Sequence, residues 1–179
     1  LEKELYEKHK KSKARITPNL MQKEALLNIL NLRNNGSNRA LLISATGTGK
    51  TYLSAFDVQK FKPKKFLFVV HRRTIAEEAM KTFQSLLDSR IKMGMFSGFD
   101  KDLEADYLFS TIQTISKSKN LDMFNQSHFD YIVIDETHRA GAKSYLGIIN
   151  YFKPKFLLGM TATPERTDGA DIFKLFNYN

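Results

Sequence analysis

The sequence contains no cysteine, and this absence excludes several kinds of site at once. Disulfide bridges, thiolate zinc sites and cysteine nucleophiles are all ruled out. Long apolar stretches are also lacking: no run approaches the roughly 18 residues that a membrane-spanning helix needs, and no signal-peptide core is visible. We therefore expect a cytoplasmic protein without a membrane partner. The chain opens on Leu1 rather than methionine, and we expect it to be part of a longer protein.

Acidic residues are in the minority, with 19 Asp and Glu against 28 Lys and Arg, which leaves a formal net charge of +9. Such a surplus favours a polyanionic partner such as nucleic acid, although a soluble basic surface alone would also account for it. A length of 179 residues and a hydrophobic fraction of 42% are typical of one packed domain.

The chain divides into a charged start and one long patterned segment. Residues 1–15 are rich in Lys and Glu with little to bury, and we interpret them as a basic tail or linker. The domain then covers residues 16–179. Thr17-Pro18 predicts the start of its first helix and Asn34-Asn35-Gly36 its end. Five residues predict the apolar face of this helix: Leu20, Leu26, Leu27, Ile29 and Leu30.

Short apolar runs then alternate with amphipathic segments. One of these segments opens on Thr74–Glu77, which has the pattern of a helix-capping box. Nearly continuous apolar runs are typical of strands covered on both faces, so the alternation predicts a mainly parallel sheet with helices on both faces, an α/β fold. The predicted strands are Ala40–Ser44, Phe66–His71, Lys92–Phe96, Tyr107–Thr111, Tyr131–Asp135 and Phe156–Met160.

A glycine-rich loop, Ala45–Thr51, lies between the first predicted strand and a helical segment. This is the context of a P-loop, in which Gly47 and Gly49 let successive backbone N–H groups point at phosphate oxygens. Lys50 is then placed to reach the β- and γ-phosphates, and the Thr51 hydroxyl to ligate Mg²⁺. The usual opening glycine of the motif is Ser44 in this chain, and a simple glycine turn is the alternative interpretation.

Two adjacent carboxylates, Asp135 and Glu136, end the predicted strand Tyr131–Asp135. Like charges side by side repel each other, which is hard to justify in a purely structural role. The pair makes sense if Asp135 faces Mg²⁺ and Glu136 orients or deprotonates an attacking water. Together with the P-loop, it predicts a site for ATP or another nucleoside triphosphate.

These motifs resemble the first RecA-like domain of a superfamily 2 helicase of the DExH type. Asp135–His138 is similar to the second motif of that family, and Ala45–Thr51 is similar to the first. Thr161-Ala162-Thr163 is similar to the third. Its extension to Arg166 is similar to that of restriction-enzyme motors and repair helicases. The resemblance implies a RecA-like P-loop NTPase fold.

The resemblance also implies roles for individual residues. Lys50, Asp135 and Glu136 would be catalytic, and Thr51 and Asp135 would hold Mg²⁺. His138, Thr161 and Thr163 would couple the nucleotide state to the grip on nucleic acid, while Arg72, Thr111 and Gln113 would contact backbone phosphates. The nucleotide itself would be held by Gln22, which selects adenine, and by Thr46, Gly47, Thr48, Gly49, Lys50 and Thr51.

The resemblance implies that two RecA-like domains form the complete motor, and the sequence after Thr163 is too short for the second. We therefore expect the chain to bind nucleotide but to hydrolyse it slowly without the second domain as its partner. The leading hypothesis is an ATP-dependent helicase or translocase acting on DNA, with RNA as the other polymer to consider. A motor subunit of a restriction-modification enzyme, an ATP-gated clamp without processive unwinding and a P-loop ATPase unrelated to nucleic acid are the alternatives.

Overall fold

The computed structural model describes residues 16–136, 143–162 and 172–177. Within these ranges no helix combines the length and the apolar character that crossing a bilayer requires. The longer helices are α2 (Leu20–Asn34), α3 (Lys50–Phe61), α4 (Arg73–Leu86) and α7 (Lys143–Tyr151). Three short helices are α5 (Ile112–Ile115), α6 (Ser118–Leu121) and α8 (Ile172–Leu175). The strands are β1 (Arg39–Ile43), β2 (Phe66–Val70), β3 (Met93–Ser97), β4 (Asp100–Lys101), β5 (Tyr107–Thr111), β6 (Tyr131–Asp135) and β7 (Phe156–Thr161).

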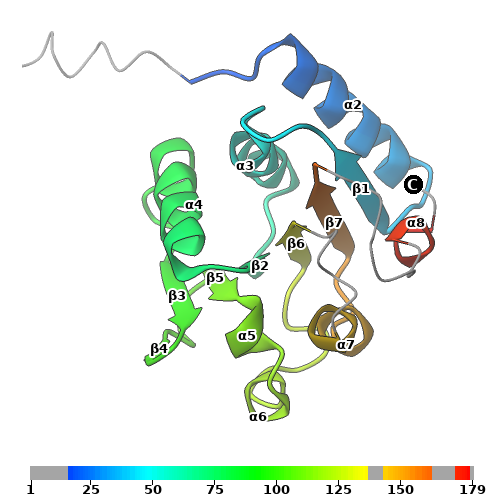
Figure 1. Ribbon diagram of the computed structural model, residues 1–179. Coiled ribbons are helices and arrows are strands. Elements are labelled where there is room, and N and C mark those ends of the chain that lie inside the picture. Colours follow the sequence, from blue (N-terminus) through cyan, green and yellow to red (C-terminus); the bar gives the residue numbers. More distant parts are fainter. Residues whose placement is uncertain (1–15, 137–142, 163–171, 178–179) are drawn as a thin grey trace, which may run out of the picture.

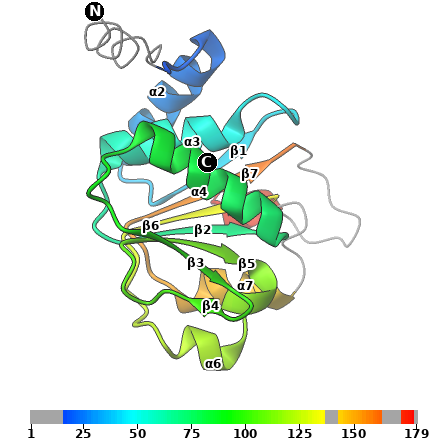
Figure 2. The same ribbon diagram turned by 90° about the vertical axis from the view of Figure 1, so that its left-hand side faces the viewer.

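The strands form one seven-stranded sheet in the order β1-β7-β6-β2-β5-β3-β4. All neighbours pair in parallel except β3 and β4, which form an antiparallel hairpin. The parallel strands point toward the same end of the sheet in Figure 2. All six predicted strands are confirmed, with bounds that differ by no more than one residue at either end. The hairpin partner β4 was not predicted, because two exposed residues carry no periodic signal.

Alternating side chains of the strands build a core on each face of the sheet. In β2, Phe66 and Phe68 join the core beneath α2, α3 and α4, whereas Leu67 and Val69 join the core on the side of α5 and α7. Figure 1 shows these two layers of helices on opposite sides of the sheet. Because both faces are covered, the central strands are nearly continuous in apolar residues, which is why the sequence showed runs rather than alternation.

Helix α2 starts later than predicted. Its N-cap is Asn19, whose side chain accepts a hydrogen bond from the Gln22 backbone N–H at 2.9 Å, while the Gln22 side chain accepts one from the Asn19 N–H at 3.0 Å. This reciprocal capping box replaces the predicted start at Thr17-Pro18. The predicted apolar face was also too broad. Only Leu26 and Ile29 of that face are buried, whereas its other members, Leu20, Leu27 and Leu30, are exposed.

Helix α4 begins at Arg73, not at the predicted capping box, and no side chain caps its first turn. Glu77 instead accepts a hydrogen bond at 2.7 Å from Arg73, four residues earlier on the same helix. The side chain that was predicted to close the box is therefore used in a pair along the helix surface.

A buried polar network joins α2 and α3 to the face of the sheet that they cover. Asp57 of α3 accepts hydrogen bonds from Arg33 of α2 at 2.8 Å and from the Tyr131 hydroxyl of β6 at 2.6 Å. The Arg33 guanidinium also lies over the Phe156 ring at 4.7 Å. Burial and the adjacent Asp57 charge raise the pKa of Tyr131 well above its ordinary value, so the hydroxyl stays a donor. The network fixes the helix that carries Gln22 against the helix that carries Lys50.

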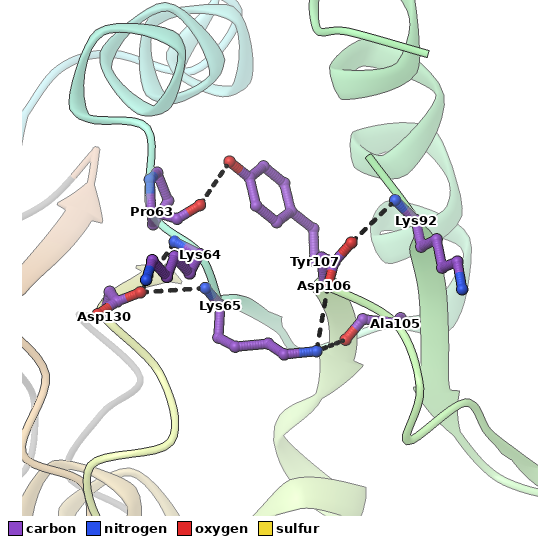
Figure 3. Close-up of polar contacts among 8 residues, drawn as sticks. All are labelled: Pro63, Lys64, Lys65, Lys92, Ala105, Asp106, Tyr107 and Asp130. Atoms are coloured by element: carbon purple, nitrogen blue, oxygen red, sulfur yellow. Dashed lines mark hydrogen bonds and ion pairs between the residues drawn. The ribbon is translucent and has the colours of Figure 1, made fainter. Parts of the chain in front are cut away.

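Charged residues of alternating sign cross the end of the sheet at which the parallel strands begin. We call Lys155, Asp130, Lys65 and Asp106, which precede β7, β6, β2 and β5, the strand-start ladder. Its ion pairs are Lys155–Asp130 at 2.9 Å and Lys65–Asp106 at 3.2 Å. Asp130 also accepts the backbone N–H of Lys65 at 3.1 Å (Figure 3). Each carboxylate thus anchors the start of the neighbouring strand.

Candidate active site

The P-loop connects β1 to α3, as the sequence predicts. Gly47 and Gly49 both adopt left-handed backbone, with φ of 78° and 79°. Only glycine takes this conformation without strain, so the two residues allow the loop to wrap back on itself. The Lys50 ammonium donates to the carbonyl oxygens of Ser44 at 3.0 Å and Ala45 at 3.1 Å. Lys50 therefore points back over the loop, where a phosphate oxygen would be able to replace these carbonyls.

Ser44, at the position of the usual opening glycine, helps to close the loop. Its hydroxyl lies 2.7 Å from the Thr48 hydroxyl, which donates to the Ala45 carbonyl at 2.7 Å. These hydrogen bonds tie the first residue of the loop to its middle. The departure from the usual motif therefore adds a contact across the loop, a consequence that the sequence alone did not indicate.

Gln22 reaches the P-loop from helix α2. Its amide NH₂ donates to the Gly49 carbonyl at 3.2 Å, while its amide oxygen caps α2 through Asn19. A Cβ at position 49 would lie 2.7 Å from the Gln22 amide nitrogen, so Gly49 is needed for this close approach as well as for its φ. The structure thus brings Gln22 into contact with the loop; its role in selecting adenine stays a prediction.

The two strand-end carboxylates, Asp135 and Glu136, lie where the chain leaves the sheet at the end of β6. Glu136 has a φ of 59°, an uncommon conformation for a residue with a side chain, and its N–H donates to the Asp135 carboxylate at 3.0 Å. Strained backbone of this kind costs about 1–3 kcal/mol and is concentrated at functional sites. Here the uncommon conformation belongs to Glu136, one of the two carboxylates.

One open cavity of ≈ 380 Å³ joins these parts. It is lined by P-loop residues, by the two strand-end carboxylates and by one side of α4, namely Thr46, Gly47, Gly49, Lys50, Thr51, Tyr52, Ile75, Glu78, Ala79, Thr82, Asp135 and Glu136. The sequence predicted the P-loop and strand-end members but missed Tyr52 and the four residues from α4. Helical periodicity identified α4 without showing which side faces the P-loop.

The oxygen donors in this cavity fit a magnesium ion. Mg²⁺ is usually held by one or two carboxylates, a hydroxyl and the substrate's own phosphates, not by a cage of protein ligands. Thr51 and Asp135 line the cavity beside Lys50 and supply a donor set of that kind. Among the residues that the structure describes, no group of three or more His, Cys, Asp or Glu side chains could hold a metal ion by itself.

Of the predicted coupling residues, only Thr161 can be placed. It ends β7 with a buried side chain, and its carbonyl accepts the Ser44 backbone N–H at 2.9 Å. The third motif is therefore joined directly to the start of the P-loop. His138 and Thr163 lie outside the described residues.

The residues predicted to contact nucleic acid lie at or just beyond the ends of β2 and β5, at the end of the sheet that carries the P-loop. Arg72 and Gln113 are exposed. Thr111 is buried, and its hydroxyl is 3.0 Å from that of Thr114 and 3.4 Å from that of Ser97. Thr111 thus positions its neighbours through hydroxyl contacts, and the phosphate-binding role of all three residues stays a prediction.

Comparisons with known proteins agree with this architecture. The chain resembles the type I restriction enzyme EcoAI endonuclease subunit of Escherichia coli, with 32% identity over 164 residues. These residues are 84% of this chain but only 20% of the relative, so the chain spans about a fifth of that protein.

Solved structures show the same fold. The UvsW helicase of bacteriophage T4 matches with a TM-score of 0.72 and 21% identity, over 93% of this chain and 58% of that one. The SWI2/SNF2 ATPase core of Sulfolobus solfataricus matches with a TM-score of 0.71 and 17% identity, over 92% and 36% of the two chains. The predicted RecA-like fold is confirmed.

A family model covers residues 15–166, which include the P-loop, both strand-end carboxylates and the third motif. The match therefore extends over most of the chain and over every part of the cavity. The chain belongs to the family described as the res subunit of type III restriction enzymes.

Proposed function

We propose that this domain binds Mg²⁺–ATP and forms the ATP-hydrolysing half of a nucleic-acid motor. The observation that carries the proposal is the cavity that joins the P-loop lysine to the two strand-end carboxylates. Family membership and the helicase folds of the solved relatives support it.

The residues of the cavity have separate roles in this proposal. Lys50 leaves the carbonyls of Ser44 and Ala45 to bind the β- and γ-phosphates, and the loop N–H groups complete the phosphate site. Thr51 and Asp135 hold the magnesium ion, which neutralises phosphate charge. Glu136 accepts a proton from the attacking water or orients it. Gln22 contacts adenine from its place beside Gly49.

The motor is complete only with further parts. We propose that a second RecA-like domain closes on the cavity and supplies the positive charge that speeds phosphoryl transfer, an effect of about 10³–10⁵ when it comes from an arginine. The polymer would be DNA in the first instance, contacted through phosphates by Arg72 and Gln113. The absence of cysteine supports a cytoplasmic location.

The setting of this motor has two candidates. We propose a DNA helicase or translocase, and the motor of a restriction-modification enzyme is the alternative that the res-subunit family and the EcoAI subunit support. An ATP-gated clamp would use the same cavity without directional movement, and assays of translocation by the parent protein would distinguish it.

A salt titration tests the nucleic-acid part of the proposal. Fluorescent single-stranded and duplex oligonucleotides should bind without sequence preference, and log K should fall with log salt with a slope of about −2 to −4, because three or four cations neutralise phosphates. Arg72→Ala should weaken binding and make this slope shallower. Arg90→Ala is the matched control, since that side chain is 89% exposed but precedes β3 at the opposite end of the sheet. Binding that ignores salt, or that depends on Arg90 and not on Arg72, contradicts the assignment.

A further inference from the structure

The hairpin of β3 and β4 carries a fully exposed aromatic side chain. Ser97 pairs with Asp100, which leaves Gly98 and Phe99 as a two-residue turn. Gly98 has a φ of 65°, the conformation for which two-residue hairpin turns use glycine. Phe99 has a relative exposure of 106%, higher than that of any other large apolar side chain that the structure describes. Packing within this domain therefore does not account for an aromatic side chain at this position.

The turn is held from both sides. Arg73, at the start of α4, donates to the Ser97 carbonyl at 3.2 Å and pairs with Asp100 at 2.5 Å. On the other side, the Gly98 N–H donates to the Thr114 hydroxyl of α5 at 3.4 Å. These contacts fix the backbone on either side of Phe99, so little conformational entropy is lost when the ring binds a partner.

The ring lies among groups that suit a phosphate backbone. Arg73 is the neighbour of Arg72, and Thr114 is the neighbour of Gln113, so the turn contacts the two segments that carry the exposed residues expected to contact phosphates. Lys117, three residues beyond Thr114, is exposed as well. The acidic residue of the hairpin, Asp100, is paired with Arg73. Arg73 itself is matched by Asp100 and Glu77, so Arg72 and Lys117 supply the positive charge in the two segments that contact the turn. Exposed cations beside a presented aromatic ring are the arrangement that binds single-stranded nucleic acid, because every base offers a face for stacking.

We propose, building on the proposed function, that Phe99 stacks on an unpaired base of single-stranded nucleic acid that crosses this end of the sheet. A protein partner fits the surroundings less well, since such an interface has an apolar centre and the residues flanking Phe99 are glycine and a paired aspartate. A duplex fits less well because its bases are already stacked on one another. Phe99 thus gives the motor a preference for strands that are already separated.

A tryptophan at position 99 reports on the contact directly, because the chain contains no other tryptophan. Single-stranded oligonucleotide should quench the fluorescence of Phe99→Trp and duplex should quench it much less. Leu27→Trp is the matched control: position 27 is 57% exposed on α2, which packs against β1 at the opposite edge of the sheet, and its fluorescence should not change.

Affinity measurements then test whether the flat ring matters. Phe99→Ala and Phe99→Leu should each weaken single-strand binding by about fivefold to a hundredfold, the usual effect of losing one base–aromatic stack, whereas Phe99→Tyr should bind as the unmodified chain does. Duplex affinity should be unchanged in all three.

The other results each overturn a definite claim. Equal single-strand affinity in Phe99→Ala, or equal quenching by duplex, overturns base stacking and leaves the proposed motor function intact. If Phe99→Leu binds normally while Phe99→Ala does not, the ring serves as an apolar contact and not as a stacking surface. If the unmodified chain binds no nucleic acid at low salt, the nucleic-acid part of the proposed function fails together with this inference.

Discussion

The two ends of the parallel sheet both concentrate charged residues, but they use them in opposite ways. Where the strands begin, the strand-start ladder joins Lys155, Asp130, Lys65 and Asp106 in ion pairs and in hydrogen bonds to the backbone. Where the strands end, Lys50 donates to two carbonyl oxygens of its own loop, and Asp135 and Glu136 line an open cavity. The backbone at this end contains left-handed residues at Gly47, Gly49 and Glu136.

The difference separates stabilising charges from charges that are arranged for a ligand. A charge that is paired within the protein contributes to folding, and its removal lowers the free energy of unfolding. A charge that lines a cavity and is carried by strained backbone contributes to binding or chemistry. Its removal should lower ligand affinity or the reaction rate. Substitutions where the strands begin should therefore lower stability and leave function intact, whereas substitutions where the strands end should do the reverse.

The largest effect is expected at Glu136. In the parent protein, Glu136→Gln should lower ATP turnover by at least about 10² through loss of the base, while Lys50 and Asp135 still bind nucleotide and Mg²⁺. Steady-state ATPase assays with a parallel binding measurement check this. The control is Glu78→Gln, which alters an exposed carboxylate in the same cavity and should retain most of the activity. Wild-type turnover in Glu136→Gln would show that another group activates the water.

At the other end, Asp130→Asn should lower the free energy of unfolding by about 1–3 kcal/mol, because charge-assisted hydrogen bonds from two backbone N–H groups and from Lys155 are lost or weakened. Nucleotide affinity should not change. Denaturant titrations of both chains measure the difference, and a loss of binding without a loss of stability would reverse the roles of the two ends.

The same substitution has a defined pH dependence. Burial alone would raise the pKa of Asp130, but hydrogen bonds from Lys155 and from the backbone of Lys65 and Lys64 outweigh it, so the pKa is lowered on folding. The unfolded chain therefore binds the proton first. The advantage of Asp130 over Asn should be complete above about pH 4, the ordinary aspartate pKa, and should disappear as the pH falls through the lower folded value.

A smaller effect is expected where α2 meets the P-loop. Asn19→Ala removes the side-chain cap of α2 and should cost about 1 kcal/mol, a fall in melting temperature of about 2–4 °C for a domain of this size. Asn31→Ala is the control on the same helix, since that residue is exposed and alanine is a better helix former. A melting temperature that falls equally in both variants would show that the cap adds nothing.

The sequence was informative where a local pattern corresponds to a local structure. The apolar runs predicted all six long strands, and the spacing of Gly47, Gly49 and Lys50 predicted the P-loop. Helix starts were less accurate. Thr17 and Thr74 have hydroxyls suitable for capping, but α2 is capped by Asn19 instead and α4 begins at Arg73 without a side-chain cap.

Contacts between distant segments could not be predicted. The approach of Gln22 to Gly49, the side of α4 that lines the cavity and the burial of Thr111 all depend on how elements pack in space. The strand-start ladder was missed for the same reason, since its members are widely separated in the sequence and only the strand order brings them together. The exposure of Phe99 could not be predicted either, because an aromatic residue in a short segment predicts burial.

Thermal unfolding of two lysine variants tests the central claim most directly. Mg²⁺–ADP at about a hundredfold excess over Kd should stabilise the unmodified chain by about 2.7 kcal/mol, a shift of several degrees. Lys50→Ala should fold normally and lose this shift. Lys65→Ala should melt at a lower temperature, because its bonds to Ala105 and Asp106 are gone, and should keep the shift. A ligand shift that survives Lys50→Ala, or that disappears in Lys65→Ala, would contradict the assignment of the nucleotide site to the end of the sheet where the strands finish.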